Sequence, residues 1–475
     1  MTKSEPRNVR SAVAQMPRTF VLRHSDFLRH SSFVLRPSTV LALLAVANGP
    51  LCCGCRPDGS AQKPLAVVIS GDTAGWIVPC GCAAKQLGGL PRRASYVRQL
   101  RDQEEVIVAD VGGAPHGTSP YDRVKFEAIL DGELATEAAA HNLGAAEVAL
   151  GPDYLEELAR SLSAPLISAN VRLADGRPLV EPLRIVETAG RRIALVGVLS
   201  PRYATDQLLI EPPREAVLEA LRDAAGQFDS AIVLAYLPEG ELRELAASLP
   251  EVDAVVGGPT GQPVAPELIG PTLLTSATNK GKFLARLDAP TASGERWKGS
   301  IVELGDQLAD DPGQMANLKR YYARLAELDF AAGRTGLVPP LPADTPPDYR
   351  VAGSAACRKC HEQECGQWER SKHAQAWASL QKTGAQIDPY CQHCHTTGYG
   401  LPGGFVSARR SAETANVGCE SCHGPAQGHV PDAKTRTTYY AQAKNHCLGC
   451  HDRENSPDFA YDTYWAQIRH GEKSR

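Results

Sequence analysis

The hydrophobic positions follow two different patterns along the chain. From Pro64 to about Leu304, short apolar runs rich in β-branched residues alternate with longer stretches in which apolar residues recur at helical spacing. The runs predict strands over 65–70, 106–109, 192–198, 230–234 and 252–256. The stretches predict helices over 92–101, 126–142, 152–162 and 214–227. Because strands alternate with helices, we expect the segment 64–310 to form an α/β layered domain.

The pattern changes after residue 310. Apolar residues at helical spacing predict a helix over 314–330, and the prolines between 336 and 347 predict an extended, semi-rigid linker. We therefore expect 311–349 to connect two domains. From 350 to 475 long aliphatic runs are few, and Gly, Pro and polar residues prevail. For this second domain we expect a mainly α structure of short helices, in which side chains alone supply little apolar core.

Residues 1–60 show no pattern of a folded core. Basic residues precede a short apolar run from Val40 to Ala47, and Asn48-Gly49-Pro50 and the cluster Cys52-Cys53-Gly54-Cys55 follow it. This order is typical of an export signal with its processing site, and the run is too short to span a bilayer. We expect export, with membrane attachment through a lipid on one of these cysteines as the alternative to ordinary cleavage.

Composition narrows the class of protein. The chain has 475 residues, which favours two or three domains, and 43% of them are hydrophobic, as in globular proteins with a proper core. The formal net charge of −4 argues against nucleic-acid binding. Eight of the fourteen cysteines belong to one repeated motif; the other six are Cys52, Cys53, Cys55, Cys80, Cys82 and Cys365.

The repeated motif is Cys-x-x-Cys-His. It occurs as Cys357-Arg-Lys-Cys360-His361, Cys391-Gln-His-Cys394-His395, Cys419-Glu-Ser-Cys422-His423 and Cys447-Leu-Gly-Cys450-His451. Two thiols at this spacing can bond the two vinyl groups of one porphyrin, and the adjacent imidazole then becomes the proximal iron ligand. A zinc site would need one closed tetrahedral set, with no reason for a His after every second Cys. The sequence therefore predicts four covalently attached haem c groups.

The remaining histidines decide what these haems can do. Nine of the thirteen histidines lie between 350 and 475, and five of them are outside the proximal positions: His373, His393, His429, His446 and His470. An iron with His on both faces transfers electrons, whereas an iron with an open position can also bind a small substrate such as an oxide of nitrogen. The residues by themselves leave both uses open.

From about Ala356 to His470 the sequence resembles the tetrahaem cytochrome c-554 family. The shared features are Trp368 with Ser371-Lys372-His373, the segment Val417 to Pro425 followed by His429, and Ile468-Arg469-His470. The resemblance implies that His373, His429 and His470 are distal iron ligands and that one haem lacks a sixth protein ligand. His393 and His446 are then neighbouring or surface residues, although either could serve the fourth haem.

The segment from Leu65 to Leu287 resembles the metallophosphoesterase domain of the 5'-nucleotidase family. The shared features are Ser70-Gly71-Asp72-Thr73-Ala74-Gly75 after the first strand, Gly88 to Arg92, Val108 to Gly113, Leu150 to Asp153, Ser168 to Val171, Ala194 to Val198 and Val255 to Thr260. The resemblance implies a layered α/β sandwich with a dinuclear metal site at the strand ends. Asp72 stands at the place of one metal ligand.

Most of that family's metal ligands are replaced here. A family His is Ala74, the bridging Asp is Gly113, and an Asn-His pair is Pro152-Asp153; the later histidines fall on Tyr236, Pro259 and Gly261. Glycine, alanine and proline side chains cannot ligate a metal, so we expect a degenerate domain without the usual two-metal hydrolysis.

Cys80 and Cys82 follow closely behind Asp72. The two thiolates could ligate a metal together with His116 or His141, or take part in redox chemistry. The alternative is a pair of inert thiols in a loop, and the sequence favours it slightly.

The leading interpretation is an exported electron-transfer protein, in the periplasm or anchored to the membrane and facing the outside. It would exchange electrons with a redox partner protein through four haems, while the degenerate domain binds a partner or small molecule. One alternative is a haem oxidoreductase that acts on a small nitrogen or sulfur compound at an open haem. Another is a metal-dependent hydrolase with atypical ligands.

Overall fold

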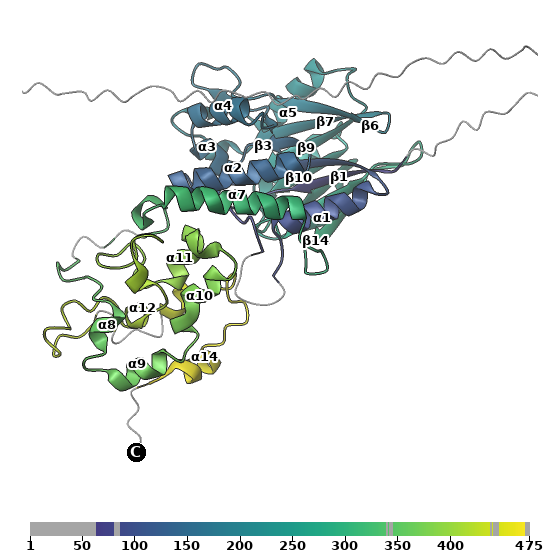
Figure 1. The fold of residues 1–475 in the computed structure, drawn as a ribbon. Helices are drawn as coiled ribbons and strands as arrows, with labels where there is room; N and C mark the ends of the chain where they lie inside the picture. The colour runs from purple at the N-terminus through teal and green to yellow at the C-terminus, as the bar shows by residue number, and fades with distance from the viewer. Residues whose placement is uncertain are drawn as a thin grey trace, which may run out of the picture. The chain divides into compact units, whose positions relative to one another are not determined.

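A computed structural model describes residues 63–79, 86–338, 341, 345–437, 439 and 446–470. The expected export segment 1–60, Cys80 and Cys82 lie outside these residues. Two six-stranded sheets form the α/β part (Figure 1). The first has the order β14 (Lys298–Glu303), β13 (Phe283–Asp288), β1 (Leu65–Ser70), β2 (Glu105–Asp110), β3 (Ala138–Asn142), β4 (Leu166–Ile167). The second has the order β11 (Val264–Ile269), β12 (Thr272–Ser276), β10 (Ala254–Gly258), β9 (Ser230–Tyr236), β7 (Arg191–Leu199), β6 (Leu183–Thr188).

The α/β part is a four-layered sandwich. The two sheets share an apolar core to which Ile69, Leu195 and Ile232 contribute. Helices α1 (Leu90–Arg101) and α2 (Pro120–Ala135) pack against the first sheet, and α7 (Pro312–Leu328) runs beside α1 and α2 and packs on them (Figure 1). Helices α5 (Pro213–Asp223) and α6 (Glu239–Ser248) pack on β7 and β10 of the second sheet. The predicted α/β layered fold is therefore confirmed.

The central strands are parallel and buried on both faces. β1 pairs in parallel with β2, and β2 with β3, so their carboxyl ends lie at one edge of the first sheet. The same holds for β7, β9 and β10 in the second sheet. Such strands appear in a sequence as continuous apolar runs without alternation, which is how they are recognised here. This edge is where the sequence expects the degenerate site.

One predicted helix is wrong over its second half. The pattern predicts a helix over 126–142, but α2 ends at Ala135, and Ala138–Asn142 forms β3. Glu137 breaks the helix because its φ is 56°, in the left-handed region. Ala138, Ala140 and His141 then pair with β2. Burial between β2 and β4 overrides the helical propensity of this alanine-rich segment.

The segment with the Cys-x-x-Cys-His motifs consists of short helices and turns. Its helices are α8 (Ser354–Cys357), α9 (Glu362–Trp368), α10 (Ala376–Gln381), α11 (Pro389–His395), α12 (Cys419–His423) and α14 (Tyr461–Ile468). A small apolar cluster around Tyr399 and Phe405 also includes Ala332. Within the described ranges, no helix is long and apolar enough to cross a membrane. This segment is mainly α, as expected.

Candidate functional site

Each motif folds as a helical turn. α8 ends at Cys357, α11 and α12 contain the whole second and third motifs, and a 3-10 turn covers Cys447–Gly449. In the first and fourth motifs the His N–H donates to the carbonyl of the first Cys, at 2.9 Å for His361 and 2.8 Å for His451. This i to i−4 contact places the histidine one helical turn from the first thiol. Local sequence is sufficient for this arrangement.

The tertiary structure brings three motif histidines together with three histidines outside the motifs. The ring centroids of His361 and His429 are 6.3 Å apart, and those of His373 and His451 are 6.2 Å apart. The centroids of His423 and His470 are 5.8 Å apart. The three partners are the residues predicted as distal ligands.

These separations fit two ligands of one iron. A metal–imidazole bond is about 2 Å and the ring centre lies about 1 Å beyond the nitrogen, so two rings on opposite faces would have centres roughly 6 Å apart. Burial lowers the pKa of His373, His423 and His451 below the usual value. These imidazoles are therefore neutral at neutral pH, which is the form that binds a metal. The residues present thus fit haem groups.

The second motif uses different contacts. His395 Nδ1 lies 2.9 Å from the Ala376 carbonyl oxygen, a contact that orients the ring and directs Nε2 to the opposite side. His393 is held inside the same helix, with Nδ1 2.6 Å from the Tyr390 carbonyl oxygen. His446 stacks on Tyr439 at a centroid distance of 3.6 Å. The three predicted distal histidines therefore lie beside the motif histidines of the first, third and fourth motifs.

Contacts between thiols group the motifs in two pairs. A hydrogen bond from Cys357 of the first motif lowers the pKa of Cys419 in the third motif to about 6 and raises that of Cys357. In the same way Cys394 of the second motif contacts Cys450 of the fourth, which lowers the pKa of Cys450 and raises that of Cys394. The first motif thus lies against the third, and the second against the fourth.

The degenerate edge of the α/β part is filled by protein groups. Asp72 accepts a hydrogen bond from the Thr278 hydroxyl at 2.8 Å, and burial raises the pKa of Asp72. At Gly113, where the family has its bridging Asp, an added Cβ would lie 2.6 Å from the Tyr236 ring. The carboxylate of Glu147 accepts the N–H groups of Gly113 and Ala114 at 3.0 and 2.7 Å. Tyr236 and Glu147 thus take the space and the contacts of the missing ligand.

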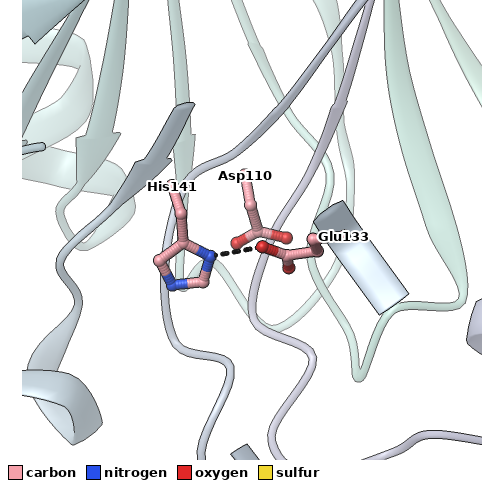
Figure 2. A group of neighbouring side chains, drawn as sticks. All are labelled: Asp110, Glu133 and His141. Carbon is pink, nitrogen blue, oxygen red and sulfur yellow. Dashed lines mark hydrogen bonds and ion pairs between the residues drawn. The ribbon is translucent and has the colours of Figure 1, made fainter. Parts of the chain in front are cut away.

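A buried ionic network lies beneath this edge (Figure 2). His141 Nδ1 is 2.7 Å from Glu133 Oε2, and its Nε2 is 3.3 Å from Glu147 Oε1. Arg93 Nη1 lies 3.5 Å from Asp110 and 3.8 Å from Glu133. Burial alone would lower the pKa of His141, but the Glu133 and Glu147 carboxylates outweigh burial and hold it well above its usual range.

Asp110, Glu133 and His141 have the composition of a metal site but do not fit one. The guanidinium of Arg93 already supplies a positive charge to both carboxylates, and both nitrogens of His141 contact carboxylates. Arg93 and His141 thus place two protein cations against the three buried carboxylates of Asp110, Glu133 and Glu147, so a metal ion would have to displace positive charge that is already in place. His116 lies elsewhere, with its Nδ1 3.6 Å from Asp122.

Sequence reasoning missed most of this network. Arg93 lies in the predicted helix 92–101 and Asp110 at the end of a predicted strand. The sequence does carry one signal for this network, namely charged residues inside or next to segments that the pattern predicts to be buried.

Comparisons with known proteins assign a resemblance to each part of the chain. The family described as "Cytochrome c554 and c-prime" matches residues 356–424. Cytochrome c-554 of Nitrosomonas europaea is 33% identical over 100 residues, which is 18% of this chain and 43% of that protein. The chain thus spans less than half the length of this relative.

Solved structures resemble the α/β part. A 5'-nucleotidase precursor from Thermus thermophilus aligns with a TM-score of 0.48 and 19% identity, over 57% of this chain and 60% of that one. The sulfate thiohydrolase SoxB from the same organism aligns with a TM-score of 0.49 and 17% identity, over 57% and 63%. The calcineurin-like phosphoesterase YfkN from Bacillus subtilis gives 0.49 and 17%, over 56% and 99%. Residues 356–424 of the chain thus resemble the cytochrome c-554 family.

Proposed function

We propose that the chain is an exported multihaem c-type cytochrome that transfers electrons through four covalently bound haems. The observation that carries this proposal is the set of three histidine pairs, because each pair has the spacing of two axial ligands of one iron. Haem c, when bound, supplies one-electron chemistry. The similarity of residues 356–424 to a cytochrome family supports the proposal.

The residues of each motif have separate roles in this proposal. The two cysteines would hold the porphyrin, and the motif histidine would bind its iron. His429, His470 and His373 would supply a second iron ligand in the first, third and fourth motifs. The thiol contacts between the first and third motifs and between the second and fourth support short distances within each pair. Electrons would then pass within the chain between a donor and an acceptor protein.

The α/β part would bind a partner or a small molecule without hydrolysing it. Tyr236 fills the space beside Gly113, and no metal ligand stands at Ala74 or Pro152. A water nucleophile activated between two metal ions therefore has no place at this edge. Covalent haem and the N-terminal signal pattern support a location in the periplasm, or anchored to the membrane and facing outward.

A second candidate function is redox chemistry on a small nitrogen or sulfur compound at the haem of the second motif. The allocation of His373, His429 and His470 to the other three motifs favours it. The chain's own contribution would be the orientation of His395 through the Ala376 carbonyl. The iron would then be held from one side by a fixed imidazole.

Haem content and ligation test both candidates on the purified, haem-loaded full chain. A pyridine haemochrome assay is expected to give four haems per chain, and EPR is expected to show at least three low-spin irons. Fewer than four haems would contradict the proposal. A fourth, high-spin haem that binds carbon monoxide when reduced would favour the second candidate, whereas four low-spin haems that ignore the gas would exclude it.

A further inference from the structure

The second motif is carried by a helix that depends on one anchor. α11 has seven residues, and a helix this short has little stability of its own. Its N-cap is Asp388, which is buried and accepts the Tyr390 N–H at 2.9 Å through Oδ1. The carboxylate thus fixes where α11 begins and how it is directed. The position of Asp388 therefore controls the position of Cys391, Cys394 and His395.

Asp388 is held by side chains of the α/β part. The hydroxyl of Tyr121, on α2, donates to Oδ1 at 2.5 Å, and the hydroxyl of Tyr321, on α7, donates to Oδ2 at 3.2 Å. Lys125 Nζ donates to the Tyr121 hydroxyl at 2.7 Å and lies 3.9 Å from Asp388 Oδ2. All four residues are buried.

This network keeps two opposite charges in the interior. Burial, with the charge of Asp388 adding to it, raises the pKa of Tyr121 and Tyr321 well above the usual value, so both hydroxyls remain donors. Lys125 also lies 5.0 Å from the ring centres of Tyr121 and Tyr390. A buried ion pair is maintained only when its hydrogen bonds are satisfied, and removal of one partner leaves the other uncompensated.

The third motif is anchored in a different way. Glu420, inside that motif, accepts the N–H groups of Ala352 and Gly353, each at 2.8 Å. A third N–H, of Ala426, donates to it at 2.8 Å. These donors are backbone groups of the haem-motif segment. Glu420 thus ties its motif to that segment, whereas Asp388 ties the second motif to α2 and α7.

A small cavity lies between the network and the loop that follows Asp72. Its volume is about 50 Å³. The loop from Ala74 to Val78, which follows Asp72, lines one side, and Lys125, Tyr321, Asp388 and Cys391 contribute to the rest. The buried charges therefore border the same space as the first cysteine of the second motif. In low-dielectric surroundings such charges act strongly on a neighbouring redox centre.

We propose that Lys125, Tyr121 and Tyr321 are positioning residues for the second haem: through Asp388 they hold the helix that presents Cys391, Cys394 and His395, and with it they tune the reduction potential of that haem more strongly than that of any other. This rests on the proposed function, which supplies the haem. Reduction adds an electron, so the positive charge of Lys125 favours the reduced state and the negative charge of Asp388 opposes it.

Two substitutions in the full-length, haem-loaded protein test the proposal in opposite directions. Lys125→Met removes the positive charge and is expected to lower the potential of one haem. Asp388→Asn removes the negative charge, keeps a side chain that caps helices well, and is expected to raise the potential of the same haem. Spectroelectrochemical titration measures the reduction potentials of the four haems, each as one component of the titration curve. A haemochrome assay verifies that four haems are bound per chain.

Matched controls separate tuning from a general disturbance. Lys125→Arg, which keeps the positive charge, is expected to leave the reduction potential of the second haem close to its wild-type value. Tyr154→Phe removes a hydroxyl that bonds Glu127 at 3.0 Å on the far side of α2 and is expected to change none of the four potentials. Glu420→Gln changes the anchor of the third motif and is expected to shift the reduction potential of a different haem.

The outcomes discriminate between the two proposals. Opposite shifts in the two variants that are largest for the same single haem would support the network. Shifts of all four components together, or no shift in either variant while four haems are bound, would overturn it. Fewer than four haems in the wild-type protein would instead contradict the proposed function. Tyr321→Phe, a change of a single hydroxyl, provides a mild variant if Lys125→Met binds fewer haems.

Discussion

The strand-end edge of the α/β part and the haem-motif segment differ in what surrounds their predicted metal-ligand positions. At the strand ends, Gly113 has no side chain, and Tyr236 and Glu147 occupy its surroundings. In the haem-motif segment, the ring centroids of His361 and His429 are 6.3 Å apart, which leaves room for one iron between the rings. The first site is closed by protein groups, and the second keeps the spacing that a metal requires.

The two parts of the chain depend on different sources of apolar core when they fold. The α/β part buries a large apolar core between and around its sheets, and this core includes no metal ligand. Its ligands can be lost without loss of the fold. In the described part of the haem-motif segment, the apolar cluster is small and surrounds Tyr399 and Phe405. Four bound porphyrins would supply the apolar mass that its side chains do not.

Loss of one paired histidine is expected to have the largest effect. His429→Ala should convert one low-spin haem of the purified protein into one that binds carbon monoxide, because the ring opposite His361 is removed. EPR and carbon monoxide titration measure this change. His446→Ala is the control, since His446 stacks on Tyr439 and not on a motif histidine. Equal spectra for both variants would refute the assignment of His429.

Disruption of the buried ionic network tests whether the closed site supports the fold. The Arg93 side chain is 4% exposed, so Arg93→Met leaves Asp110 without its ion-pair partner and Glu133 with His141 alone, and should cost about 3–5 kcal/mol of unfolding free energy. The Arg98 side chain is 56% exposed in its pair with Asp311, and Arg98→Met should cost at most about 1 kcal/mol. Urea unfolding followed by circular dichroism measures both. Similar losses would argue against a structural network.

Restoration of one lost ligand is expected to destabilise the site. Gly113→Asp introduces a Cβ 2.6 Å from the Tyr236 ring at a residue with φ of 80°, and should cost about 2 kcal/mol. In the double variant with Tyr236→Ala, part of this loss should be recovered as a coupling of about 0.5–3 kcal/mol. A double-mutant cycle in urea measures the coupling. Strict additivity would show that Tyr236 does not fill this space.

The pH dependence of stability gives the smallest expected effect. The folded pKa of His141 is raised above the unfolded value, so its contribution is complete below about pH 6.5 and is lost as the pH rises through the folded pKa. The unfolding free energy should therefore fall more with rising pH in the wild-type protein than in His141→Gln. Urea titrations between pH 6 and 9 compare the two. Identical slopes would mean that His141 is neutral in the folded protein.

Much of the architecture could be predicted because it depends on local pattern. The apolar runs at 65–70, 192–198 and 230–234 lie within the strands β1, β7 and β9, and the helix predicted over 314–330 agrees with α7. The error at 126–142 arises because alanine suits a helix in isolation, and only the neighbours β2 and β4 make Ala138–Asn142 a strand. The domain boundaries at 310 and 350 stay predictions.

The residues of the candidate site also fall into two groups, those that local sequence predicts and those that only the tertiary structure brings together. A Cys-x-x-Cys-His motif is a single helical turn, so its thiols and proximal histidine can be recognised without knowledge of the rest of the chain. Which distant histidine meets which motif, and that Tyr121, Lys125 and Tyr321 hold Asp388, depends on contacts between residues far apart in sequence. Such contacts leave no periodic signal, because loop closure and packing of the whole chain decide them. The sequence therefore predicts four haem sites, and the tertiary structure decides which residues lie beside each motif, since side-chain pairing and charge burial are properties of the folded interior.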